Sequence, residues 1–322
     1  MSEEPVVRAH EDIDVAIIGG GPTGLAAGIY AARALRRTVV WEHSMIGGQI
    51  AQAGLVENYP GFPDGIEGYD LAMAMHGQAE RFGVETKYEP VSALRREPPY
   101  YIIESESGLY RAKAVIVTAG AEQNKLDVPG ETELTGKGVS YCATCDAAFF
   151  KDQEVAVVGG GDAALDEALF TTRYASKVSV IHRRDQFRAS RLLQRRALEN
   201  PKIAPIWNTV VERVNGEDEV ASLDLRSVES GEQSRLEVAA LFVFIGQTPN
   251  SGLLSGLVPL DRGGHAYVNL WMETEQPGLY AAGDVRVDAA RQIVSAAGDG
   301  ATAAIRADQY ISTHFDARPA AK

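Results

Sequence analysis

The chain has 322 residues, 45% of them hydrophobic and 23% charged, which is typical of a soluble globular protein with about two domains. Its formal net charge of −13 argues against binding to nucleic acid or to an anionic membrane surface, because both need a basic face. Two cysteines are too few for an extracellular disulfide framework, and residues 1–14 lack the segments of a signal peptide, so we expect a cytoplasmic location.

A strand, a glycine-rich turn, a helix and a second strand open the chain, and the same series recurs 140 residues later. Each strand is a short apolar run rich in β-branched residues, which is typical of buried parallel strands. The predicted elements are strand 14–18, the turn GGGPTG, helix 25–36 and strand 38–41 in the first copy, and strand 154–158, the turn GGGDAA, helix 163–174 and strand 178–181 in the second. The repeat predicts an α/β fold with two Rossmann-like units.

A further strand that ends in glycine closes each unit, at 114–120 and at 240–246. Proline and polar residues predict linkers near 124–130 and near 247–251. The remaining segment contains another strand that ends in glycine, followed by a helical tail from about Gln292. This tail is too short for a third domain, and the pattern alone leaves open which unit it packs on.

The first turn has the dinucleotide spacing Gly19-x-Gly21-x-x-Gly24. The first glycine allows the tight turn, the second lets a pyrophosphate approach the backbone, and the third lets helix and strand pack closely. Glu42 ends the second strand, where a carboxylate can accept both ribose hydroxyls of NAD or FAD. We therefore predict a dinucleotide with free ribose hydroxyls; the alternative is a helix-turn packing motif without a ligand.

The second turn keeps Gly159 and Gly161 but has Ala164 at the third glycine position, which the fingerprint permits. The position equivalent to Glu42 holds His182, and arginines follow it. Guanidinium groups there would bind a 2′-phosphate through charge-assisted hydrogen bonds, which predicts NADPH. The alternative is a solvated basic face. The residues concerned are His182, Arg183, Arg184 and Arg188.

The only two cysteines are Cys142 and Cys145, at CxxC spacing, fourteen residues ahead of Gly159. Such a pair can close a small, reducible disulfide. Two alternatives remain, a zinc half-site that would need two further ligands, and a pair of buried structural cysteines. Next to two nucleotide-binding turns, the pair favours a redox disulfide, and no metal is expected. Asp146 could supply or remove the proton of each thiol step, or serve as a helix N-cap, or do both.

The motifs together resemble the bacterial low-molecular-weight thioredoxin reductases of the FAD-containing pyridine nucleotide–disulfide oxidoreductases. The likeness runs over essentially the whole chain, and CATC ahead of GGG with HRRDxFRA downstream is very specific. The motifs are GGGPTG, Gly47-Gly48-Gln49, Glu57-Asn58-Tyr59-Pro60-Gly61, CATCD, GGGDAALDEAL, HRRDQFRA, Ala281-Ala282-Gly283-Asp284 and Arg291-Gln292.

The resemblance implies a fold and a cofactor for each unit. It implies that 1–125 and 249–322 form a discontinuous FAD-binding domain, and that 126–248 form an inserted NADPH-binding domain with the redox CxxC. Members of the group are usually homodimers. By position, the implied flavin-site residues are Gly47, Gly48, Gln49, Asn58, Gly120, Gly283, Asp284, Arg291 and Gln292. Carried over, Cys145 is the flavin-side sulfur and Cys142 the thiol that attacks the partner, with Asp146 handling the proton.

The chain departs from the group's pattern in two places. Asp162 and Ala163 stand where the group often has Asn and then Thr or Ser, and the added negative charge near the pyrophosphate is expected to weaken NADPH binding. The segment 260–268 is specific to this chain, and its sequence gives no functional interpretation.

The expected function is reduction of a protein disulfide, most simply that of thioredoxin, by electrons that pass from NADPH through FAD and the cysteine pair. The alternatives are a reductase of another small disulfide protein and a flavin redox sensor, and the arginine set argues against the sensor. A ferredoxin reductase of related architecture would lack the CxxC. A peroxidase reductase would carry its own N-terminal dithiol domain, whereas 13 residues precede the first predicted strand.

Overall fold

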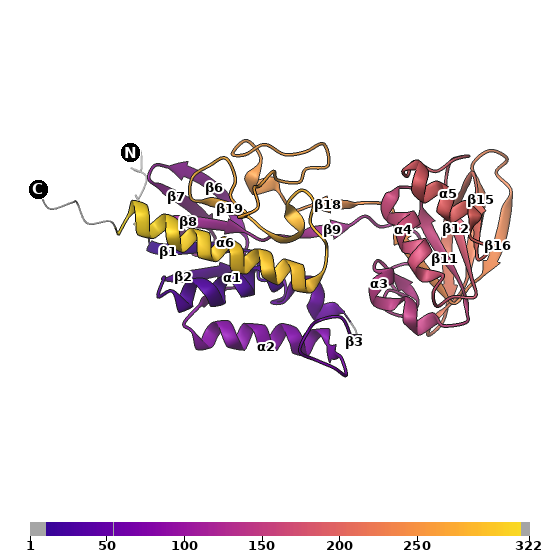
Figure 1. Ribbon diagram of the computed structural model, residues 1–322, viewed down its shortest axis with the longest axis horizontal. Helices are drawn as coiled ribbons and strands as arrows, with labels where there is room; N and C mark the ends of the chain where they lie inside the picture. The colour runs from indigo at the N-terminus through magenta and orange to yellow at the C-terminus, as the bar shows by residue number, and fades with distance from the viewer. Residues whose placement is uncertain (1–10, 54, 317–322) are drawn as a thin grey trace, which may run out of the picture. The chain divides into compact units, whose positions relative to one another are not determined.

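A computed structural model describes residues 11–53 and 55–316 (Figure 1). The chain folds into two compact units. The first unit comprises the described residues up to Glu122 and from Thr248 onward, and the second unit is Gln123–Gln247. The boundaries expected from sequence, 125/126 and 248/249, lie three residues and one residue beyond these (125 against 122, 248 against 247).

A seven-stranded sheet forms the centre of the first unit, in the order β5-β2-β1-β8-β7-β6 with β19 also paired to β8. β1, β2, β5, β8 and β19 run parallel to one another, and β7 pairs antiparallel with both β6 and β8. The strands are β1 (Glu11–Ile18), β2 (Thr38–Trp41), β5 (Glu85–Lys87), β6 (Val91–Glu97), β7 (Tyr100–Ser105), β8 (Gly108–Val117) and β19 (Leu279–Ala281).

Three helices cover this sheet, α1 (Pro22–Arg33), α2 (Gly68–Arg81) and α6 (Ile293–His314). α6 lies along α1, as the yellow and indigo helices of Figure 1 show. The two backbones approach so closely that a Cβ on Gly300 would lie 2.0 Å from the Thr23 carbonyl oxygen. The C-terminal segment therefore belongs to the first unit, with β19 in its sheet, which confirms the prediction that the second unit is inserted into the first.

Short elements complete the first unit and the two chain crossings. β9 and β18, which contain the crossings, pair with each other, and β3 pairs antiparallel with β4. These elements are η1 (Gly48–Gln52), β3 (Leu55–Val56), β4 (Ile66–Glu67), β9 (Ala121–Gln123), β18 (Gln247–Pro249), η3 (Gly252–Leu254) and η4 (Gly283–Val285).

The second unit has a five-stranded parallel sheet in the order β10-β17-β11-β12-β13, and a separate antiparallel sheet in the order β14-β15-β16. Its strands are β10 (Val139–Ser140), β11 (Glu154–Gly159), β12 (Lys177–Ile181), β13 (Ile203–Ile206), β14 (Thr209–Gly216), β15 (Val220–Ser227), β16 (Gln233–Glu237) and β17 (Ala240–Phe244). Its helices are α3 (Ala143–Asp146), η2 (Ala147–Phe150), α4 (Asp162–Thr171) and α5 (Arg191–Glu199).

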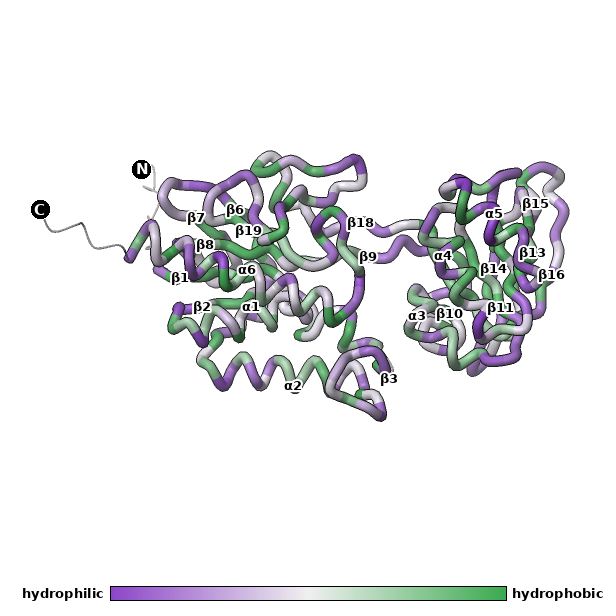
Figure 2. The backbone as a smooth tube through the Cα atoms, in the orientation of Figure 1, coloured by the Kyte–Doolittle hydropathy of each residue, from purple (hydrophilic) through white to green (hydrophobic). Residues whose placement is uncertain are grey.

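The internal repeat seen in the sequence extends to the strand register. Val15 pairs with Thr38 in the first unit, and Val155 pairs with Val178 in the second, so both partners keep the offset of 140 residues. Hydrophobic stretches of the chain fall on the central strands of each unit (Figure 2). The two Rossmann-like units predicted from the repeat are therefore confirmed.

Candidate functional site

The first glycine-rich turn lies between β1 and α1, and its glycines have different structural roles. A Cβ on Gly19 would lie 2.4 Å from the Thr118 carbonyl oxygen, and one on Gly24 would lie 1.9 Å from the Gly19 carbonyl oxygen. Gly21 instead faces open space, because the nearest atom to its Cβ position is 3.9 Å away. Gly19 and Gly24 are thus needed for packing, whereas Gly21 leaves room over the helix N-terminus, which fits a bound pyrophosphate.

Glu42 follows β2 and lies buried beside this turn. One carboxylate oxygen accepts a hydrogen bond from the Gly20 N–H at 2.8 Å, and the other accepts one from the Ser44 N–H at 2.8 Å. Each carboxylate oxygen has a second lone pair, so the group can still accept ribose hydroxyls. Glu42 therefore fixes the turn as well as standing where the ribose-binding acid is expected.

Three of the other residues expected near the flavin, Gln49, Asn58 and Gln292, form hydrogen bonds between distant parts of the first unit. The Gln49 side chain donates to the Ala121 carbonyl oxygen, and Asn58 Nδ2 lies 3.1 Å from Gln292 Oε1. The first bond joins η1 to β9, and the second joins the segment after β3 to the residue before α6. The structure thus brings Asn58 and Gln292 together, although they are 234 residues apart.

Four of the expected glycines have backbone angles that favour glycine, and one of them is held by a neighbouring carboxylate. Gly47, Gly48, Gly120 and Gly283 all have positive φ. Burial raises the pKa of the Asp284 carboxyl group, and the nearby Arg291 opposes that rise. The sequence did not single out Asp299, which accepts hydrogen bonds from the Gly283 N–H at 3.1 Å and from Arg286 at 2.7 Å.

The second glycine-rich turn lies between β11 and α4 and has the same division of roles. A Cβ on Gly159 would lie 2.4 Å from the Phe244 carbonyl oxygen and 2.6 Å from the Ala164 Cβ. A Cβ on Gly161 would meet no atom of the described chain within 4 Å. Ala164 is buried and fits at the third position, so this turn too leaves room for a pyrophosphate.

His182 takes the place of Glu42 beside the second turn and is 5% exposed. Its ring packs over Gly160, where a Cβ would lie 2.3 Å from it, and also lies near Phe187 and Trp207. Burial, assisted by Arg188 and the arginines nearby, lowers the pKa of the imidazole. The side chains of Arg183, Arg184 and Arg188, which follow His182 in the chain, are exposed.

Cys142 and Cys145 form a disulfide with Cα atoms 5.3 Å apart, where α3 begins. Cys142 is partly buried and Cys145 is exposed. Within residues 11–53 and 55–316, no group of three or more His, Cys, Asp or Glu side chains could hold a metal ion. Cys142 and Cys145 are bonded to each other, and Cys145 is exposed, which distinguishes the pair from two buried structural cysteines.

Asp146 is held by a residue that the sequence did not single out. Its Oδ2 accepts a hydrogen bond from the buried Ser140 hydroxyl at 2.6 Å, and the same hydroxyl oxygen accepts one from the Cys142 N–H at 3.1 Å. Burial raises the pKa of the Asp146 carboxyl group, and the Ser140 hydrogen bond opposes that rise. Asp146 stands at the N-cap position of η2, but its side chain makes no capping hydrogen bond there.

A second carboxylate also reaches the CxxC segment. Glu167 on α4 accepts a hydrogen bond from the Thr144 N–H at 3.1 Å, and Thr144 Oγ1 lies 3.4 Å from Cys142 Sγ. Burial raises the pKa of Glu167. Sequence reasoning missed Glu167 because no local pattern links α4 to the cysteines.

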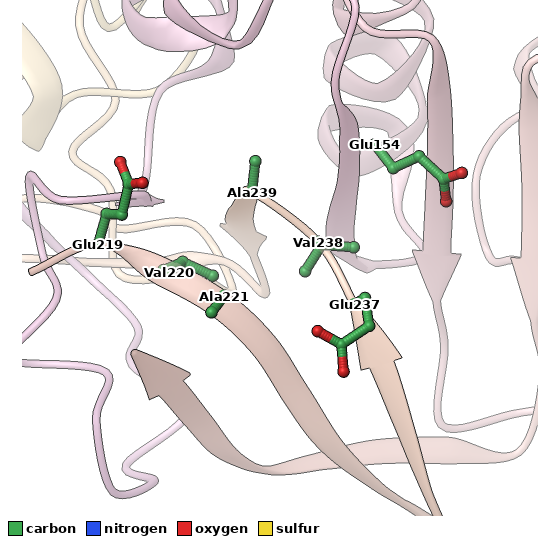
Figure 3. A pocket seen from close by; sticks show the side chains of 7 residues that line it. All are labelled: Glu154, Glu219, Val220, Ala221, Glu237, Val238 and Ala239. Carbon is green, nitrogen blue, oxygen red and sulfur yellow. The ribbon is translucent and has the colours of Figure 1, made fainter. Parts of the chain in front are cut away.

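A pocket of about 510 Å³ lies elsewhere in the second unit and contains none of these residues. Its three glutamates point in different directions, and Glu154 is paired with Lys177 at 3.2 Å (Figure 3). The lining residues are Glu154, Glu219, Val220, Ala221, Glu237, Val238 and Ala239. The described helices include none that is long and apolar enough to cross a membrane.

Comparison with known proteins agrees with this geometry. The chain matches the family model "Pyridine nucleotide-disulphide oxidoreductase" over residues 13–300. It is 44% identical to the thioredoxin reductase of Peptoclostridium litorale, over 94% of this chain and 98% of that protein. It is 43% identical to the thioredoxin reductase of Bacillus subtilis (strain 168), over 97% of this chain and 96% of that protein.

A solved structure shows the same likeness in three dimensions. The thioredoxin reductase from Streptococcus pyogenes MGAS5005 superposes with a TM-score of 0.89 at 40% identity, covering 95% of this chain and all of that one. The paired glycine-rich turns, the inserted unit and the CxxC disulfide thus occur in a chain that is similar to these enzymes over nearly its full length. The chain belongs to the pyridine nucleotide-disulphide oxidoreductase family.

Proposed function

We propose that the protein is a thioredoxin reductase that uses FAD and NADPH. The observation that carries the proposal is the composition of the second unit, which holds the Cys142–Cys145 disulfide, an open glycine turn at Gly161 and exposed arginines after β12. A nucleotide site and a reducible disulfide in one unit fit transfer of electrons from NADPH to a thiol pair. The high similarity to enzymes named thioredoxin reductase supports the choice of substrate.

The two cofactors are assigned from the differences between the turns. Glu42 beside the first turn suits the free ribose hydroxyls of FAD, and the arginines beside the second suit the 2′-phosphate of NADPH. FAD, when bound, supplies the chemistry that converts the hydride of NADPH into an electron pair for the disulfide. The proposed flavin-site residues are Gly19, Gly21, Gly24, Glu42, Gly47, Gly48, Gln49, Asn58, Gly120, Gly283, Asp284, Arg291 and Gln292.

The cysteines carry the exchange with the partner. Two electrons and two protons convert the disulfide into two thiols, and the Cys142 thiolate then attacks the partner's disulfide to form a mixed disulfide. Cys145 attacks that bond, which releases the partner as a dithiol and restores the Cys142–Cys145 bond. We assign the proton that a leaving thiolate needs to Asp146, which follows Cys145 in the chain and whose carboxyl pKa is raised by burial.

Assembly and location follow from the same proposal. We place the protein in the cytoplasm, because the reaction consumes NADPH and the chain has no cysteines beyond the reactive pair. The protein acts as a homodimer, in line with the resemblance, and light scattering of the purified protein tests this. The same reaction with another small disulfide protein is the alternative, and the choice is tested by comparing substrates.

The experiment measures NADPH-dependent reduction of thioredoxin by the purified yellow protein, with NADH as the control. Wild type should reduce thioredoxin, whereas Cys142→Ser and Cys145→Ser should both fail while NADPH still bleaches their flavin. Cys145→Ser should trap a mixed disulfide with thioredoxin through Cys142, and Cys142→Ser should not. Turnover that survives in both variants would contradict the proposal, and trapping by Cys142→Ser alone would reverse the roles of the two cysteines.

A further inference from the structure

We propose that Asp162 is a positioning residue for NADPH, which ties the glycine-rich turn of the second unit to the loop that carries Arg188. The tie couples recognition of the pyrophosphate by the turn to recognition of the 2′-phosphate by the arginines. The inference rests on the proposed function, because it takes the nucleotide of the second unit to be NADPH.

Three hydrogen bonds join the two segments. The Arg188 and Ala189 N–H groups both donate to the Gly160 carbonyl oxygen, at 2.6 and 3.1 Å. The Ser190 N–H donates to Asp162 Oδ1 at 2.5 Å. Asp162 is the only side chain among these contacts, so it is the part of the tie that a substitution can remove.

The contact is not an ordinary helix cap. Asp162 is the first residue of α4, and the N-cap residue Gly161 makes no side-chain capping hydrogen bond. The Asp162 carboxylate instead reaches a segment 28 residues further along the chain, just before α5. The side chain therefore links the start of α4 to the segment before α5 and does not cap its own helix.

The two units differ in how an acidic side chain holds the glycine-rich turn. There the acid at the end of the second strand reaches back, and Glu42 accepts the Gly20 N–H. In the second unit that position holds His182, and the residue equivalent to Asp162 in the first unit is Pro22, 140 residues earlier. In the first unit, the acid lies after the second strand and accepts from the turn. In the second unit, the acid lies at the turn and accepts from the segment that follows the second strand.

Asp162 consequently has two opposing effects on the nucleotide. Its negative charge repels the pyrophosphate, as the sequence predicts, while its hydrogen bond holds the arginine loop in place. Repulsion from the pyrophosphate weakens NADP⁺ and NAD⁺ alike, whereas loss of the loop position weakens only the nucleotide that carries a 2′-phosphate. The ratio of the two affinities therefore separates the effects.

The test measures binding of NADP⁺ and NAD⁺ to the flavin-containing protein by calorimetry. Asp162→Ala removes the acceptor and Ser190→Pro removes the donor; Ser190 has φ −56°, which proline adopts without strain. Both should weaken NADP⁺ by about 3- to 10-fold relative to NAD⁺, as expected for one exposed charge-assisted hydrogen bond. The double variant should lose no more than either single one, since both remove the same bond.

Two matched controls keep a hydrogen bond between the Ser190 N–H and residue 162, and each changes one other property. Ser190→Ala retains the backbone N–H and should bind like wild type. Asp162→Asn retains a carbonyl acceptor without the charge, so it should lower the ratio of NADP⁺ to NAD⁺ affinity less than Asp162→Ala does and should bind NAD⁺ more tightly than wild type. An unchanged ratio in Asp162→Ala and Ser190→Pro, or a ratio in Asp162→Asn as low as that in Asp162→Ala, would overturn the inference. A wild-type protein without preference for NADP⁺ would contradict the NADPH assignment itself, and the inference with it.

Discussion

Substitution of Ser140 by alanine tests whether the environment of Asp146 is built for proton transfer. The Ser140 hydroxyl is buried, donates to Asp146 at 2.6 Å and accepts the Cys142 N–H at 3.1 Å. Alanine removes both contacts and leaves the half-buried Asp146 carboxylate without its serine hydrogen bond. A hydrogen bond to a charged group contributes about 1.5–3 kcal/mol, so Ser140→Ala should lower the free energy of unfolding by about that amount at neutral pH.

The sign of the pH dependence follows from the raised pKa of Asp146. A carboxyl group whose pKa is higher in the folded state binds its proton more tightly when folded, so it favours folding at low pH. That contribution is lost as the pH rises through the folded pKa. Ser140 opposes the rise in pKa, so Ser140→Ala should raise the pKa of Asp146 further. The destabilisation should therefore be largest at neutral pH and smaller where the carboxyl group is protonated.

Urea-induced unfolding of Ser140→Ala and wild type at about pH 7.5 and about pH 4.5 measures this difference. Ser222→Ala is the matched control, because Ser222 is fully buried and its hydroxyl has no hydrogen-bond partner among the described residues. In thioredoxin reduction, the alkaline fall in rate of Ser140→Ala should move to higher pH, and Ser140→Thr should restore the wild-type profile. Equal destabilisation at both pH values, with an unmoved rate profile, would refute the reasoning.

The remaining predictions concern the two nucleotide sites. Replacing Arg183 and Arg184 by alanine should raise the KM for NADPH by roughly one to two decades per arginine and leave that for NADH nearly unchanged; equal losses would mean that they do not bind the phosphate. Gly161→Ala should unfold like wild type, since its Cβ meets no described atom within 4 Å, yet bind NADP⁺ more weakly in calorimetry. Glu42→Ala leaves the buried Gly20 N–H without its acceptor, so the protein should retain less flavin through gel filtration; unchanged flavin content would remove Glu42 from the site.

Local patterns predicted the parts of the fold that depend on local sequence. The glycine spacing around Gly19 and Gly159 and the apolar runs before them specify a strand, a turn and a helix, and the register of the two copies repeats as their sequences do. The predicted helices begin and end up to three residues away from α1 and α4, because helix ends depend on capping contacts.

Contacts between distant segments could not be predicted in this way. The sequence pattern left open which unit the helical tail after Gln292 packs on, and packing of α6 along α1 places it in the first unit. Asp162 was expected only to repel NADPH, since no pattern links it to the Ser190 N–H. Ser140 lies six residues from Asp146, yet a serine in a short strand carries no signal until the loop between them is folded.

The number of electrons that the protein accepts from NADPH per flavin tests the central claim most directly. FAD and the Cys142–Cys145 disulfide each accept two electrons, and NADPH delivers two. Anaerobic titration of the wild-type protein, with free thiols counted at the end, should consume about two equivalents of NADPH per flavin and yield two thiols, which added thioredoxin disulfide then reoxidises. Cys145→Ser should consume about one equivalent. Consumption of one equivalent by wild type, with the disulfide still closed when the flavin is fully reduced, would contradict the proposed route of electrons.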